Sequence, residues 1–303
     1  MADYDIFTGV SHIGYPGYSE NLAENFMMYL DWAFLNIGAF NNVHRNQTVY
    51  GQDPSQLRQV DSRTYESYRK GWVWESGLYY QTQPIQISGV YINNTFYTPA
   101  QTGYHINYRD GQVIFDNPMS GTVQVEYSYK LYQTYNFDNA KWFDDILGGE
   151  WVTTYSDFNQ VGSGAFNVLA QNRVNVPFVC VEVVPRRDFK GLQLGGGQIV
   201  YQDIQFWVAS TEPWHVKTAA DAISFQNDKT FKLFNMKFIQ DAHRWPYNYD
   251  GTINPSGAQY KELVDTYFWK KAHSNDTSVE KISNAPLYIS TVRMTLEADF
   301  EEI

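Results

Sequence analysis

The sequence is poor in cysteine and in positive charge, and both shortages exclude classes of protein. Cys180 is the only cysteine among 303 residues, which excludes an intramolecular disulfide framework and a metal site built from several thiolates. Lys and Arg number 22 against 33 Asp and Glu, so the formal net charge is -11. General binders of nucleic acid or anionic membranes depend on clustered cations, so this balance argues against both. It does not exclude a surface past which DNA slides.

Long apolar runs are missing as well. The most apolar stretch, residues 26–40, is interrupted by Asp31, Asn36 and Gly38 and falls short of the roughly 20 residues that a membrane span needs. The first five residues lack the basic segment and apolar run of a signal peptide. We therefore expect a soluble protein that is made and retained in the cytoplasm, with no membrane partner.

Aromatic residues, in contrast, are abundant, with 24 Tyr, 19 Phe and 9 Trp making up 17% of the chain. This composition excludes disorder, because the chain has ample apolar surface to bury. Tyr and Trp also dominate protein interfaces and carbohydrate-stacking sites. Trp72-Val73-Trp74 and Tyr79-Tyr80 are candidates for such a platform, although a period of two makes one member of each group a core residue.

Residues 1–71 are predicted to hold one helix followed by an extended arm. Ser19 can act as the N-cap, and apolar residues from Leu22 to Ile37 follow the spacing of a helix with one buried face, ending near Gly38. Residues 41–70 are polar and irregular, so we expect a loop or arm there.

Residues 72–135 are predicted to form a small antiparallel β domain. Asp110-Gly111 lies between two short apolar runs and is the strongest hairpin signal in the chain. A second hairpin is expected at Ser120-Gly121, followed by a strand over 123–131 that alternates apolar and polar residues. Residues 136–175 are expected to be a linker or long loop, with a short helix near 142–147 and a Gly-, Ser- and Asn-rich stretch over 148–175.

Residues 176–303 are predicted to form an α+β domain with a mixed or antiparallel sheet flanked by helices. Residues 178–184 and 199–209 are expected to be buried strands. A helix is expected from Thr211, with Pro213 in its first turn and Trp214 among its inward residues, and another after a Ser256 cap. The chain ends in a long alternating strand over 288–300, a length that suits a sheet continuing into a neighbour.

A search for chemistry assigns no catalytic, cofactor-binding or metal-binding residue. The glycine run 191–197 lacks the pattern of a phosphate-binding loop, and residues 247–251 are more simply a turn than half a calcium loop. Cys180 lies in an apolar run and is expected to be a core residue. The carboxylates weighed as catalytic acids are Asp144, Asp145, Glu150 and Glu182. The histidines, none at zinc-motif spacing, are His12, His44, His105, His215, His243 and His273.

Two regions of the sequence resemble known families. The segments 89–93, 104–108, 111–116 and 123–129 (GVYIN, YHINY, GQVIFD and VQVEYSY) resemble a β module common in virion proteins of tailed bacteriophages. The second half is similar to phage tail terminator and head–tail neck proteins. That resemblance rests on the order of Pro177–Glu182, the glycine run, a strand through Phe206–Val208, a helix, and a final strand over 291–296.

The resemblance implies a structural virion protein without enzymatic activity. Such a protein forms a homo-oligomeric ring, commonly a hexamer, in the neck of the virion, where it terminates the tail and joins it to the head connector. Its partners are other copies of itself, tail tube or sheath proteins, and connector or neck proteins. Viral DNA passes through the ring, and an acidic lumen would repel the phosphate backbone. We expect residues 41–70 and 148–175 to reach neighbouring subunits.

Three alternatives stay open at this stage. One is another neck or tail ring, such as a connector adaptor or stopper. The second is a receptor-binding or carbohydrate-binding tail or baseplate protein, motivated by the aromatic content and the β domain. The third is an enzyme such as a glycan hydrolase, for which Glu182, Asp144 and Asp145 would be the first residues to test.

Overall fold

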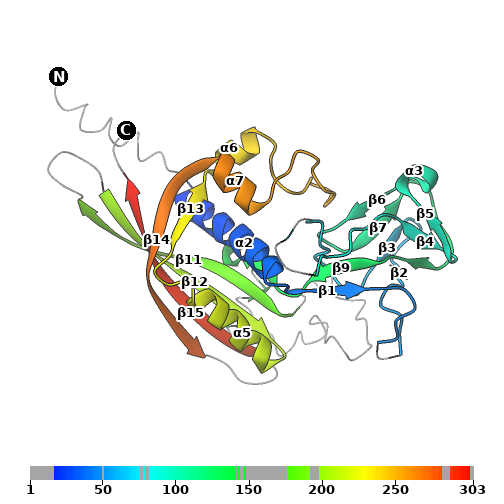
Figure 1. The fold of residues 1–303 in the computed structure, drawn as a ribbon, viewed down its shortest axis with the longest axis horizontal. Coiled ribbons are helices and arrows are strands. Elements are labelled where there is room, and N and C mark those ends of the chain that lie inside the picture. The colour runs from blue at the N-terminus through cyan, green and yellow to red at the C-terminus, as the bar shows by residue number, and fades with distance from the viewer. Residues whose placement is uncertain are drawn as a thin grey trace.

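The computed structural model describes residues 17–49, 51–75, 78, 82–140, 142–143, 147, 176–191, 198–281 and 287–300. The protein is α+β, as the sequence predicted. It consists of two parts side by side (Figure 1). We call residues 40–130 the β module, and we call the rest of the described chain, which surrounds a six-stranded sheet, the sheet unit.

The sheet unit contains a curled sheet with helices packed on it. The sheet order is β10-β11-β12-β15-β14-β13, and every neighbouring pair is antiparallel except β10 with β11, which makes the sheet mixed. Its strands are β10 (Gln133–Asn136), β11 (Phe178–Gly191), β12 (Gln198–Ser210), β13 (Thr230–Phe234), β14 (Phe268–Lys281) and β15 (Tyr288–Phe300). Its helices are α2 (Tyr18–Asn36), α5 (Pro213–Ser224), α6 (Met236–Asp241) and α7 (Tyr260–Thr266), with the short 3-10 turn η1 (Phe137–Asn139).

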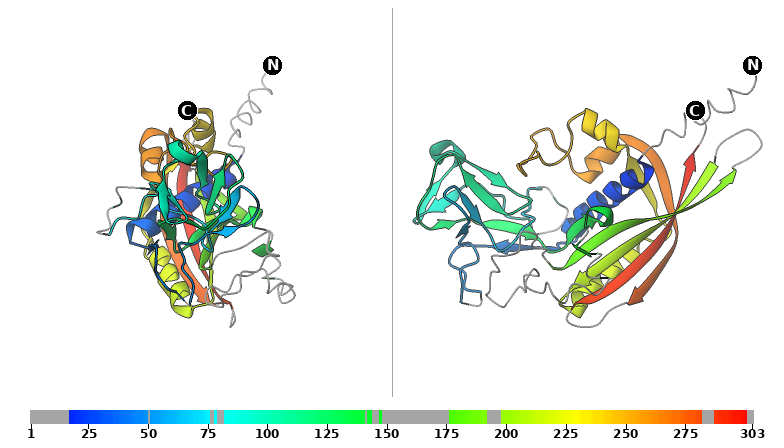
Figure 2. Two further views of the ribbon diagram at one scale, coloured as in Figure 1. Left: turned by 90° about the vertical axis from the view of Figure 1, so that its right-hand side faces the viewer. Right: turned by 180° about the vertical axis from the view of Figure 1, so that it is seen from behind.

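Helices α2 and α5 pack on the same face of this sheet and create its largest core. Leu22, Phe26 and Phe34 of α2 belong to the same apolar cluster as Phe206 of β12, and the rings of Phe26 and Phe206 lie 5.7 Å apart. Ala219, Ala220 and Ile223 of α5 complete the same apolar cluster. The two views in Figure 2 show the helices on one side of the sheet, whose other side faces away from them. We refer to these as the helix-covered face and the open face.

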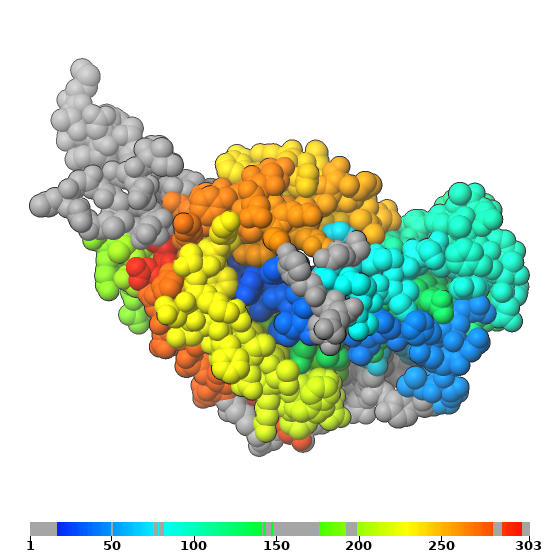
Figure 3. All heavy atoms as spheres, viewed as in Figure 1, coloured from blue at the N-terminus to red at the C-terminus, as the bar shows by residue number. Residues whose placement is uncertain are grey.

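Polar residues of α2 also fix the outer edge of the sheet at β13. The buried side chain of Asn25 accepts from the backbone N–H of Phe234 and donates to its carbonyl, both at 3.0 Å. The Tyr260 hydroxyl of α7 donates to the carbonyl of Lys232 at 2.7 Å. These side chains take the place of a further strand. Figure 3 shows the segment that carries α6 and α7 lying along α2.

The β module is built from short strands. They are β1 (Phe40–Val43), β2 (Arg58–Gln59), β3 (Thr64–Glu66), β4 (Val90–Ile92), β5 (Thr95–Tyr97), β6 (Tyr104–Asn107), β7 (Gln112–Phe115), β8 (Val123–Gln124) and β9 (Tyr127–Lys130), with one helical turn, α3 (Pro99–Thr102). They form a four-stranded sheet, β2-β3-β7-β6, a three-stranded sheet, β5-β4-β8, and the pair β1-β9. Trp72, Tyr65 and Tyr127 are fully buried at the centre of the module.

The grouping of the chain differs from the predicted boundaries at 71 and 135. The predicted arm over 41–70 contains strands β1, β2 and β3, which pair with β9, with each other and with β7. The N-terminal helix belongs to the core of the sheet unit. The β module is thus inserted between α2 and β10. Strands of two to four residues are too short to show a period of two, so their sequence looks irregular.

The Asp110-Gly111 hairpin is confirmed, whereas the second predicted hairpin is wrong. β6 and β7 pair antiparallel around this turn. Gly111 has φ 67, and a Cβ there would lie 2.3 Å from the carbonyl oxygen of Arg69, so the turn requires glycine. Ser120-Gly121 does not connect paired strands, because β8 pairs with β4 rather than with β7.

Several predictions for the second half are confirmed and others are wrong. The strands over 178–184, 199–209 and 288–300 exist, and Pro213 is the first residue of α5. Trp214, however, points outward and is 56% exposed. The N-caps of α2 and α7 are Gly17 and Gln259 rather than Ser19 and Ser256. No helix in the described ranges is long and apolar enough to cross a membrane.

Candidate assembly surface

The open face of the sheet is a polar surface formed by long strands. Along β12 the burial alternates, with Gln202, Ile204, Phe206 and Val208 buried under the helices and Tyr201, Asp203, Gln205 and Trp207 on the other side. β15 alternates in the same way from Val292 onward. The period of two therefore separates an apolar face from a polar face on each long strand.

The polar side chains of the open face bond to one another across strands. Asp203 accepts from the hydroxyl of Thr295 at 2.6 Å and from the guanidinium of Arg293. Burial on its own would raise the pKa of Asp203, but the hydrogen bonds from Thr295 and Arg293 lower it below its usual value. Asn275 donates to Glu297 at 2.7 Å. These bonds hold the carboxylates in place on the sheet.

The open face also carries a small excess of negative charge. Cross-strand partners share a face, so the register assigns its charged residues. The carboxylates are Glu182, Asp188, Asp203, Asp276, Glu280 and Glu297, and the cations are Arg186, Lys190, Lys232, Lys271 and Arg293. Among the described residues, six negative and five positive charges leave a formal excess of one negative charge. A surface of this sign repels a phosphate backbone.

One end of the open face is covered by aromatic residues. The segment that follows β10 places Phe137 and Phe143 against Trp207, with the rings of Phe137 and Trp207 stacked at 6.1 Å. The indole N–H of Trp207 donates to the carboxylate of Glu182 at 2.6 Å. Cys180 is fully buried in this cluster, which confirms that it is a core residue. Glu182 therefore orients an aromatic side chain.

A second candidate site lies where the β module meets α2. We call it the joint cavity, a hollow of about 240 Å³ bordered by α2, the module and residues 245–260. At its base the ammonium of Lys130 lies 2.5 Å from a carboxylate oxygen of Asp31 and 3.3 Å from Glu75. Lys130 and Glu75 are both almost completely buried. This ion cluster joins the last strand of the module to α2.

Burial shifts the protonation of the acids around the joint cavity. It raises the pKa of Glu75, even though the Lys130 ammonium opposes the rise. Burial would lower the pKa of Lys130, but the carboxylates of Asp31 and Glu75 raise it well above its usual value. Lys130 is therefore charged, with Asp31 as its closest partner. Burial also raises the pKa of Glu24 to about 7, with a smaller contribution from the charge of Glu20.

Aromatic rings also line the joint cavity. Its lining includes Trp32, Trp74, Trp245, Tyr247 and Tyr260. The indole nitrogen of Trp74 has no hydrogen-bond partner among the described residues. Sequence reasoning noticed Trp74 but missed the cavity, because Lys130 is separated from Asp31 by 99 positions and from Glu75 by 55. No short motif could have linked them.

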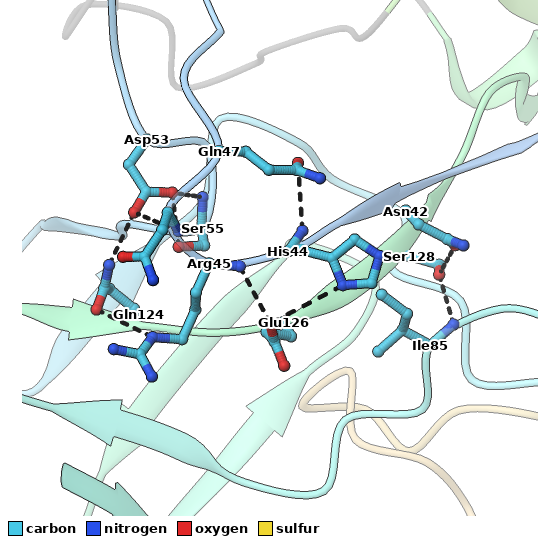
Figure 4. Close-up of polar contacts among 11 residues, drawn as sticks. Asn42, His44, Arg45, Gln47, Asp53, Ser55, Ile85, Gln124, Glu126 and Ser128 are labelled. Atoms are coloured by element: carbon cyan, nitrogen blue, oxygen red, sulfur yellow. Dashed lines mark hydrogen bonds and ion pairs between the residues drawn. The ribbon is translucent and has the colours of Figure 1, made fainter. Parts of the chain in front are cut away.

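A network of polar side chains ties the module's loops to its strands (Figure 4). Asp53 accepts from the backbone N–H and hydroxyl of Ser55 at 2.9 and 2.7 Å, and from the amide of Gln124 at 2.8 Å. The guanidinium of Arg45 reaches Gln124 and also lies 3.8 Å from the centre of the Tyr91 ring. The network fixes the loop that leads into β2.

The other candidate residues from the sequence do not lie together in one site. Trp72 is fully buried, so of the Trp72–Trp74 group only Trp74 is accessible. Asp250 accepts from both the backbone and hydroxyl of Thr252, as in a turn. Histidines 44, 105, 215, 243 and 273 lie in separate places, and the described part of the chain holds no group of three metal-ligating side chains. Positions outside the described residues are His12, Tyr79, Tyr80, Asp144, Asp145, Glu150, residues 148–175 and residues 192–197.

Two comparisons with known proteins gave no match. No model of a known protein family matches the sequence. A search of curated proteins gives no match either.

Proposed function

We propose that this chain is a structural virion protein of a tailed bacteriophage, which forms a ring in the neck, terminates the tail and joins it to the head connector. The observation that carries the proposal is the sheet unit, whose sheet has helices on one face and, on the other, an open face of hydrogen-bonded carboxylates with a small excess of negative charge. Its order of β11, β12, α5 and β15 agrees with the order of elements on which the resemblance to tail terminators rests.

The carboxylates of the open face have a physical use in such a ring. DNA that leaves a capsid must pass through the neck quickly, and each cation in its path would form attractive contacts with phosphate. Carboxylates held by cross-strand hydrogen bonds, such as Asp203 and Glu297, cannot fold away from the passage. In the proposed ring the open face lines the lumen, and the helices and the β module lie outside it.

Three experiments test this function. Negative-stain images of the purified protein should show rings with a central hole, and a phage lacking the gene should make heads and tails that do not join. A trimeric spike, or normal joined virions without the protein, would contradict the proposal. A variant with Asp203→Lys and Glu297→Lys should still form rings but slow DNA ejection. The matched control is the exposed pair Asp241→Lys and Glu262→Lys on α6 and α7, which should eject DNA at the normal rate.

The joint cavity supports a second candidate function, carbohydrate binding in a tail or baseplate protein. Tryptophan rings beside carboxylates provide the stacking surface and the hydrogen-bond acceptors that sugars use. Titration with host-envelope oligosaccharides, followed by tryptophan fluorescence, should then show saturable binding that is lost in Trp74→Ala. Unchanged fluorescence over the whole titration would count against this alternative.

A further inference from the structure

Two stretches of strand edge in the sheet unit lack a partner strand among the described residues. β10 pairs only with Phe178–Val181, so the outer edge of β11 is uncovered from Glu182 to Gly191. β13 pairs with β14 only up to His273, so the outer edge of β14 is uncovered from Asn275 onward. The two stretches lie on opposite edges and at opposite ends of the sheet (Figure 1).

The chemistry of the two edges is complementary. Residues 186–191 of β11 carry Arg186, Arg187 and Lys190 against one acid, whereas residues 275–280 of β14 carry Asp276 and Glu280 and no Lys or Arg. Each stretch also exposes one large apolar side chain, Phe189 at 59% and Val279 at 51%. Both of these face the helix-covered side, because they pair with Val200 and Val292.

From these observations we infer that β11 of one copy pairs with β14 of a second copy of this chain, antiparallel, with Asp188 opposite Ser278. The direction follows from the sheet itself. β11, β12, β15 and β14 alternate in direction, so a neighbouring β14 placed beside β11 continues the alternation. The inference builds on the proposed function, since it names the contact by which the subunits of the ring associate.

Charge and face select this register among the alternatives. With Asp188 opposite Ser278, Arg186 faces Glu280 and Lys190 faces Asp276, and Phe189 lies diagonal to Val279. A shift of one residue would exchange the two faces of the added strand. A shift of two residues in either direction would place Asp188 opposite Asp276 or Glu280. Pro185 marks one end of the contact because it has no N–H to donate.

The contact is head-to-tail, because each copy offers two different edges. Such contacts generate a closed ring when the rotation between copies closes, and an open filament when it does not. Lysine, proline and a bulge on an edge can instead protect it from pairing. β11 has all three in Lys190, Pro185 and the register shift between Val183 and Arg187. Disulfide trapping distinguishes an edge that pairs with a second copy from an edge that is protected from pairing.

Disulfide trapping tests the register directly. Asp188→Cys combined with Ser278→Cys should form disulfides between copies under mild oxidation and give a ladder of multimers on a non-reducing gel. The two positions are too far apart within one chain to bridge, and Cys180 is buried, so every new bond joins two chains. Phe189→Cys with Thr277→Cys tests the next pair in the same register, which has the other hydrogen-bonding geometry.

The control pair is Asp188→Cys with Glu280→Cys, which is two residues out of register and should cross-link at least fivefold less. Equal cross-linking of the control, or a product no larger than a dimer, overturns the inference. Cross-linking that appears only after removal of residues 1–16 also overturns it, because the chain's own terminus then covers the edge. Rings on the grid without any cross-link would refute the edge contact and leave the neck function standing. A ladder of cross-linked multimers from a protein that is absent from the virion neck would support the edge contact and refute the neck function.

Charge reversal provides a second measurement. Glu280→Lys should weaken association about fivefold per contact, because it places two cations opposite each other. Adding Arg186→Glu should restore association to near the original level. Glu262→Lys makes the same change of charge on the exposed side of α7 and should leave association unchanged. Failure of Arg186→Glu to rescue Glu280→Lys would contradict the register.

Discussion

The β module and the sheet unit are stabilised in different ways. The sheet unit has strands of 13 or 14 residues at its centre, and its core between sheet and helices is apolar. The β module has strands of at most 4 residues, and its buried groups include the charged residues Glu66, Glu75 and Lys130. Long ladders satisfy the backbone by themselves, whereas short strands depend on side chains such as Asp53, Gln124 and Ser128 to fix the loops between them.

The largest effect should come from the apolar core of the sheet unit. Phe206→Ala removes a fully buried ring between β12 and α2 and should lower the free energy of unfolding by about 4 kcal/mol. Gln205→Ala, the next residue on the open face, should change it by no more than about 0.5 kcal/mol. Urea denaturation followed by circular dichroism measures both. Similar losses for the two variants would mean that the two faces do not differ as described.

The joint between the two regions should show the next largest effect. Lys130→Met leaves the buried carboxylate of Glu75 without its cation and should cost about 3 kcal/mol. Adding Glu75→Leu removes the unpaired charge and should recover most of the loss. Limited proteolysis at the connections near residues 37–39 and 131–132 should accelerate in the single variant only. A double variant as unstable as Lys130→Met would show that packing, rather than charge, holds the joint together.

Within the β module the expected effect is smaller and local. Asp53→Ala removes the acceptor for Ser55 and Gln124 and should cost about 1.5 kcal/mol, because the buried amide of Gln124 loses a partner. Asp53→Asn keeps one acceptor oxygen and should cost less. Hydrogen exchange should accelerate in residues 45–57 and stay unchanged in β12 and β15. Faster exchange in those long strands would contradict the separation of the two regions.

A pH dependence of stability should appear at the joint cavity. The pKa of Glu24 is about 7 in the folded protein against an ordinary value of 4.5, so the folded state holds a proton that the unfolded state has lost between these values. Stability should therefore fall as the pH rises from 4.5 to 7, by up to about 3 kcal/mol. Glu24→Gln should flatten this part of the profile. Thermal unfolding at a series of pH values tests it, and an unchanged slope in the variant would count against the assignment.

Local signals in the sequence were sufficient for elements that carry their own pattern. The Asp110-Gly111 turn and the alternation along 288–300 each predicted an element that exists. β14 was missed, because its uncovered half contains a single apolar residue, Val279, and shows no alternation. Ser19 and Ser256 have capping chemistry but lie outside the positions where the helices begin.

Non-local features could not be predicted at all. Pairing of β1 with β9 joins residues 40–43 to residues 127–130, and nothing in either segment marks the other. The same holds for the side chain of Asn25, which bonds to Phe234 across 209 positions. The open face was foreseen in part, since the alternation of the last strand separates Val292 from Arg293. Its balance of charge depends on how five strands are ordered, which only the fold determines.

The insertion of the β module has a consequence for how this protein can vary. The chain leaves α2 through Phe40–Val43 and returns through Tyr127–Lys130, and these two strands pair with each other. The backbone N–H of Leu131 then bonds to the carbonyl of Ala39, so departure and return lie side by side. Residues 44–126, beyond this two-stranded stem, form an insertion whose two ends lie next to each other, which we call the cassette. A different cassette, or a tight turn, could be grafted onto the same stem while the sheet unit keeps its ladder intact.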